Sequence, residues 1–221
     1  MKIKATLAIA AATLAVGAIT SQAQVYSQNI VGYVNVPLVK GYNMIANPLD
    51  DGNGNQLTNL FASLPNKSQI LTWHGTVYDT SIGKGGGVWG GNTNLPPGLG
   101  FFLNSPSATT ITNTFSGSLY DPAGQGTGDL VTNVLPVGYT LVGSQLPYAG
   151  DATLDNTNLA LAPVLANKSQ LLSWNPSTQV FNTSVGKGGG VWGGSFPVTV
   201  GQGFFVNVPA SHATNWVQTL P

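Results

Sequence analysis

The chain has 221 residues, of which only 6% are charged, with seven lysines, seven aspartates and no arginine or glutamate. A nucleic-acid-binding protein needs a basic patch to neutralise phosphates, so this class is excluded. Cysteine is also absent, so stability must come from an ordinary hydrophobic core rather than from disulfides.

The N-terminus has the three parts of a secretory signal peptide. Lys2 and Lys4 precede an apolar run over residues 5–19, and the small residues of "SQA" follow it. The run is shorter than the ~20 residues that a membrane-spanning helix needs. We therefore expect that residues 1–23 are removed and that the mature chain has no integral membrane segment. Its predicted location is the extracellular medium or the outer cell surface, with the periplasm as the alternative.

The rest of the chain contains two copies of one module. "NKSQILTW" at Asn66 returns as "NKSQLLSW" at Asn167, and "GKGGGVWGG" occupies both residues 83–91 and 186–194, at offsets of 101 and 103 residues. This period matches an independently folding domain and is too long for a solenoid unit. The predicted boundaries are module 1 over residues 24–120, a linker over residues 121–128 and module 2 over residues 129–221.

In chain order, most segments of each module are short, rich in β-branched and aromatic residues, and separated by Gly, Asn, Pro or Asp, which is typical of strands and turns. Residues 69–73 place Leu71 and Trp73 on one face of a predicted strand, which is expected in the core. Residues 56–64 have apolar side chains at helical spacing, and residues 156–166 repeat this more loosely. Each module is therefore predicted to be an antiparallel β-sandwich or barrel with one short helix.

Both copies resemble a family of modules found in secreted bacterial proteins. "GYNMIANPL", the strand-turn-strand around Trp73 and "GLGFFLN" are similar to the "GWNLIGNPY … GQGFFV" pattern of that family, whose members often precede type IX sorting tails. The resemblance covers residues 31–106 and 137–209. Tyr42 and Tyr139 replace the usual Trp, and module 2 lacks the Asn-Pro pair. The resemblance implies a β fold and an extracellular or cell-surface location, and it supplies no functional residues.

The repeated glycine stretch has two interpretations. Residues 85–90 satisfy G-x-G-x-x-G, but neither copy is followed by a helix, and no Ser or Thr follows Gly-Lys as in a phosphate-binding loop. No cofactor is therefore predicted. The tryptophans of the stretch either fold in as a hydrophobic lid, which the usual burial of Trp favours, or lie exposed as platforms for a sugar ring. In the second interpretation the ligand-binding residues are Lys84, Trp89, Asn92, Lys187 and Trp192.

Candidate metal and catalytic residues are few. Asp51, Asn53 and Asn55 have the spacing of a calcium loop, but the expected glycine is missing and the chain has no Glu to close the site, which favours a polar turn. His74 and His212 occupy unrelated positions, and no G-x-S-x-G motif is present. We predict neither a metal site nor a catalytic centre.

These observations predict a secreted, non-catalytic structural or cell-surface-associated protein. Weakly charged surfaces and strand edges favour contact with identical chains or with cell-surface components. The alternative is an extracellular glycan-binding protein that holds a polysaccharide through its loop tryptophans. A third hypothesis, a hydrolase that uses aspartates, has less support because the sequence identifies no pair of aspartates that would face each other across a cleft.

Overall fold

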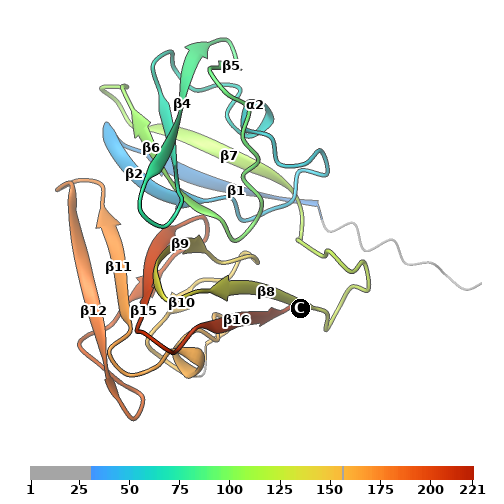
Figure 1. The fold of residues 1–221 in the computed structure, drawn as a ribbon. Helices are drawn as coiled ribbons and strands as arrows, with labels where there is room; N and C mark the ends of the chain where they lie inside the picture. The colour runs from blue at the N-terminus through green and yellow to red at the C-terminus, as the bar shows by residue number, and fades with distance from the viewer. Residues whose placement is uncertain (1–30, 156) are drawn as a thin grey trace, which may run out of the picture.

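The computed structural model describes residues 31–155 and 157–221 (Figure 1). The predicted signal peptide, residues 1–23, lies outside the described residues. No helix in the described part of the chain has the length and apolar character needed to cross a membrane.

The first half of the chain forms a β-sandwich, in which a five-stranded sheet faces a two-stranded ribbon (Figure 1). In spatial order, the strands of the sheet are β2 (Gly41–Ala46), β6 (Gly100–Ser105), β3 (Gln69–Trp73), β4 (Tyr78–Gly85) and β5 (Val88–Trp89). The ribbon pairs β1 (Val31–Leu38) with β7 (Ile111–Ser118), and the helical turn α2 (Leu57–Leu60) supplies buried leucines to the core between the layers. All these strand pairs are antiparallel.

The second half repeats this arrangement. In spatial order, its sheet contains β13 (Val191–Trp192), β12 (Val180–Gly188), β11 (Gln170–Asn175), β15 (Gly203–Val208) and β9 (Gly138–Gly143). Its ribbon pairs β8 (Leu130–Leu135) with β16 (Thr214–Thr219), and a small extra pair joins β10 (Gly150–Asp151) to β14 (Pro197–Val198). The prediction of two tandem antiparallel β-sandwich modules is confirmed.

Both helical elements are shorter than the sequence pattern predicts. Of residues 56–64 only one turn is α-helical, and Pro65 disfavours helical geometry at the residue before it. In module 2 the element is a 3-10 turn, η1 (Ala162–Val164). Pro163 has no N–H to donate, and Ala160 has a φ of 50°, which no right-handed helix allows.

The two faces of strand β3 pack against the cores of different modules. Ile70 is buried in the core of module 1, beside Leu103 of β6. Leu71 and Trp73 point to the other side, where they and Phe102 pack against the core of module 2. Leu71 and Trp73 thus face a hydrophobic core as expected, but it is the core of module 2, because this sheet is covered on both faces.

The backbone contacts between the modules occur in reciprocal pairs. Ala46 N donates to Gly201 O at 2.9 Å, and Gly143 N donates to Gly98 O at 3.0 Å. Gly143 stands in β9 where Ala46 stands in β2, so each edge strand meets the same segment of the other module. The modules are therefore related by an approximate two-fold axis, as in an isologous dimer.

The indoles of the two sheets repeat this exchange. Trp73 Nε1 donates to Tyr139 O at 2.9 Å, and Trp174 Nε1 donates to Tyr42 O at 2.7 Å. An indole N–H that is partly withdrawn from water needs an acceptor, and for Trp73 and Trp174 the acceptor belongs to the other module. The strand-turn-strand tryptophans are therefore docking residues.

The repeated G-x-G-F-F sequence allows the close approach. A Cβ atom on Gly100 would lie 2.7 Å from Val142 O, and a Cβ atom on Gly203 would lie 2.6 Å from Ile45 O. Only glycine fits where two backbones come this close. Phe102 then packs against its counterpart Phe205 across the interface, and the two ring centroids lie 6.5 Å apart.

Candidate functional site

The repeated "GKGGGVWGG" stretch forms a tight hairpin in each module, between β4 and β5 and between β12 and β13. Three successive residues, Gly85, Gly86 and Gly87, have φ angles of 86°, 61° and 77°. Their equivalents in residues 188–190 have φ angles of 90°, 60° and 76°. Residues with a side chain rarely adopt this left-handed region, so the hairpin backbone itself requires the run of glycines.

The two hairpin tryptophans lie in different surroundings. Trp89 is 9% exposed and belongs to the core of module 1, where its ring meets that of Phe61 with centroids 6.4 Å apart. Trp192 is half-buried and lines a groove of about 390 Å³. Trp89 is thus placed as a lid residue, whereas Trp192 leaves part of its ring beside an open groove.

One substitution between the copies accounts for this difference. At the offset of 101 residues that relates Asn66 to Asn167, Phe61 corresponds to Ala162. Ala162 lines the groove beside Trp192, and its methyl group cannot cover an indole as a phenyl ring does.

The two lysines of the repeated stretch lie away from the tryptophans. In β12 the groove is lined by Gly186 and Gly188, so Lys187 between them points to the opposite face. There its Cε atom is 3.9 Å from the Cβ position of Gly193. The structure does not bring Lys187 to Trp192, and the equivalent lysine of module 1, Lys84, lies in the same way over Gly90.

Asn92 is used inside module 1. Its Oδ1 atom accepts hydrogen bonds from the backbone N–H and the hydroxyl of Thr58, both at 3.4 Å. These contacts tie the residues after the hairpin to the start of α2, the helical turn that carries the cover of Trp89. Asn92 therefore supports the closed arrangement of module 1 and lies apart from the groove of module 2.

Two polar side chains that sequence reasoning missed do line the groove. Asp155 and Asn167 stand on either side of the glycine turn, near Gly190 and Gly188 respectively. The sequence does not mark Asn167 as a ligand-binding residue, because the same residue, Asn66, occupies the equivalent position in module 1. Asp155 lies in a loop that differs between the copies, so the repeat offered no comparison for it.

The loop that carries Asp151 holds the far end of the module 2 hairpin. Burial raises the pKa of the Asp151 carboxyl, but hydrogen bonds from Ser195, Thr153 and Phe196 outweigh burial and lower it to about 2. Ser195 and Phe196 directly follow the glycine stretch. The ionised carboxylate therefore fixes the segment that follows the hairpin.

The calcium candidates form a turn that bonds to itself. Asp51 Oδ1 accepts the backbone N–H groups of Asn53 at 2.8 Å and Asn55 at 2.7 Å. Asn55 Oδ1 accepts from Asn47 Nδ2 at 2.9 Å and from Asp51 N at 3.0 Å. The Oδ1 atoms of Asp51 and Asn55 thus accept hydrogen bonds from protein donors. Within residues 31–155 and 157–221, no three His, Cys, Asp or Glu side chains gather as a metal site.

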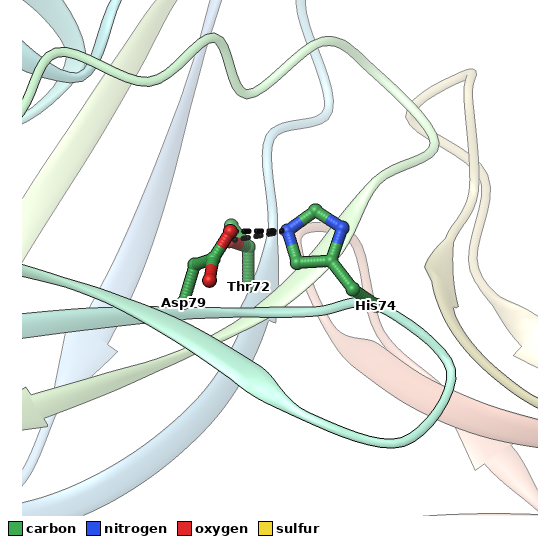
Figure 2. A network of polar contacts seen from close by, with 3 residues as sticks. All are labelled: Thr72, His74 and Asp79. Carbon is green, nitrogen blue, oxygen red and sulfur yellow. Dashed lines mark hydrogen bonds and ion pairs between the residues drawn. The ribbon is translucent and has the colours of Figure 1, made fainter.

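His74 belongs to a small polar cluster on the β3–β4 hairpin (Figure 2). Its Nε2 atom lies 3.1 Å from Asp79 Oδ2 and 3.4 Å from Thr72 Oγ1. In a catalytic triad the nucleophile and the carboxylate contact opposite nitrogens of the ring, whereas here both contact the same one. The side chains of His74 and Asp79 are 56% and 78% exposed. The cluster joins the two strands of the hairpin and lacks the geometry of a proton relay.

Comparison with protein-family models, with curated proteins and with solved structures gives no match for this chain.

Proposed function

We propose that this is an exported, non-catalytic structural or cell-surface-associated protein, whose two modules act as one body. The observation that carries the proposal is the reciprocal docking of the modules. The motifs that the copies share are accounted for by architecture: G-x-G-F-F and the strand tryptophans make the interface, and the glycine stretch makes a hairpin. A repeated sequence that serves the scaffold supports a scaffolding role.

Strands β4 and β12, each next to the short edge strand of its sheet, supply a surface for association. On β4, Tyr78 and Ile82 are partly exposed, and so are the equivalent Phe181 and Val185 on β12. The rings of Tyr78 and Phe181 also border the interface, where each contacts Phe102. They alternate with the side chains that face the core, so each strand presents an apolar row to solvent. Exposed apolar patches on a protein with few charges favour contact with other macromolecules or with identical chains. We call these four residues the apolar rows.

Fractionation of producing cells tests the proposal. We expect the mature protein in the cell-surface fraction or in sedimenting assemblies. The double variant Ile82→Ser, Val185→Ser should release it, since it removes an aliphatic side chain from each apolar row. Val88→Ser is the control, because Val88 is also apolar and exposed but lies in the hairpin strand β5. A strictly monomeric protein that stays free of cells at high concentration would contradict the proposal.

A further inference from the structure

We propose that the groove beside Trp192 is a binding site for a neutral carbohydrate, and that this site exists in module 2 alone. The inference goes beyond the proposed structural role, because it concerns recognition of a small ligand by the isolated protein. It also differs from a pair of equivalent sites, which the repeated tryptophans by themselves would predict.

The indole of Trp192 is held as a fixed platform. One end of its ring lies 3.7 Å from the Cβ position of Gly186, so the ring lies against strand β12. The rest of the residue is partly exposed to the groove. A rigid, half-covered aromatic surface offers a large contact area at little cost in conformational entropy, and it suits the apolar face of a sugar ring.

Two side chains beside the platform are free to bind hydroxyl groups. Within residues 31–155 and 157–221, no hydrogen bond engages the carboxylate of Asp155 or the side-chain amide of Asn167. A carboxylate accepts two hydrogen bonds at once, and an amide both donates and accepts. Adjacent sugar hydroxyls match this combination. Such a platform with a few polar groups at its edge is the usual composition of a small-ligand site.

Charge selects the class of carbohydrate. Asp155 is the charged side chain among the described residues that line the groove, and Lys187 faces the other side of β12. An acidic polysaccharide or a phosphorylated sugar would meet a carboxylate without a compensating cation, which disfavours binding. The groove volume of about 390 Å³ lies within the range of small-molecule sites, roughly 300 to 1,000 Å³. The lining therefore fits neutral hexoses and N-acetylhexosamines.

Module 1 lacks such a site for a visible reason. Phe61 packs on Trp89 and also on Phe101 and Phe115, with ring centroids 5.8 and 5.6 Å apart. Its ring therefore belongs to a packed aromatic cluster and closes the face that Ala162 leaves open in module 2. The repeat thus provides its own control, since the same hairpin sequence occurs once covered and once beside a groove.

Calorimetric titration of the mature protein with neutral monosaccharides and disaccharides of glucose, galactose, mannose and N-acetylglucosamine tests the inference, with glucuronate as the acidic probe. We expect saturable binding of a neutral sugar at one site per chain. Ala162→Phe, which copies the cover of module 1, should weaken binding about tenfold or more. Asp155→Ala should also weaken it, and this exposed position keeps the test valid if Ala162→Phe fails to fold.

Matched controls separate a site from a general effect. Lys187→Ala and Trp89→Phe should leave the affinity unchanged, whereas Trp192→Phe should reduce it. The inference is overturned if no neutral sugar in the panel binds, if two sites per chain are found, or if Ala162→Phe and Asp155→Ala bind as wild type does. Because the titration uses purified protein, a negative result leaves the cell-surface proposal standing, and the fractionation result does not affect the titration.

Discussion

Gly100 and Gly203 show how strongly a missing side chain can shape this molecule. Each lies against the backbone of the other module, and a methyl group at either position would overlap a carbonyl oxygen or its neighbours. Neither backbone can move far, because each belongs to a hydrogen-bonded strand. Single atoms therefore control the distance between the two sheets.

We predict that Gly100→Ala lowers the free energy of unfolding by about 1–3 kcal/mol, because the new methyl group would overpack the interface. Thermal unfolding followed by circular dichroism measures this effect. Gly32→Ala is the control, since a Cβ atom there meets nothing within 4 Å. Equal losses of unfolding free energy in both variants would show that the intrinsic strand propensity of alanine, rather than the interface, explains the result.

Asp151 makes the stability depend on acid. Its pKa is lowered to about 2 from the ordinary value of 3.8, so its ionised form stabilises the folded state. This contribution is fully present above about pH 4 and is lost as the pH falls through the folded-state pKa. We predict that wild type loses stability between about pH 4 and pH 2, and that Asp151→Asn loses less over this window. Denaturation midpoints measured across this range would contradict the prediction if the two profiles were parallel.

At the scale of elements, the alternation of side chains along strands explains most of the fold. It does not determine which core each face of a strand packs against. The alternation of side chains in residues 69–73 correctly separates the two faces of β3, but it does not indicate which face packs in the module's own core. Ile70 and Thr72 are buried on one side, and Leu71 and Trp73 are half-buried on the other. A sheet covered on both sides gives no polar face by which sequence could choose.

We predict that Trp73→Phe and Trp174→Phe each lower the free energy of unfolding by about 1 kcal/mol, because each variant keeps an aromatic ring but removes an indole hydrogen bond between the modules. The approximate two-fold axis makes the two losses similar. Urea denaturation measures them, with the exposed His74→Asn as control, since Asn175 stands at the corresponding turn of module 2. A loss in only one of the two tryptophan variants would argue against reciprocal docking.

At the scale of the whole molecule, the two modules share a core. Met44 and Phe102 of module 1 belong to the same buried cluster as Phe204, Phe205 and Val206 of module 2. An interface of this kind couples the folding of the two halves, because neither sheet can expose its second face without losing buried apolar area. The two modules therefore form one folding unit rather than two independent domains.

We predict a single cooperative unfolding transition, with equal calorimetric and van't Hoff enthalpies. Differential scanning calorimetry of the purified protein measures both enthalpies. Gly100→Ala should broaden or split the transition, since it weakens the interface while leaving each module's own core intact. Two separated transitions in wild type would mean that the modules unfold independently despite their contacts.

The sequence by itself determined the repeat, the antiparallel β class and the glycine hairpins, because these depend on neighbouring residues: side-chain alternation, turn chemistry and the φ angles that only glycine adopts freely. The tertiary structure decided which faces dock and which tryptophan is covered. Trp89 and Trp192 stand in nine identical letters, yet one is buried and the other lines a groove. The difference comes from Phe61 and Ala162, residues distant in the chain, which only folding brings to the indoles.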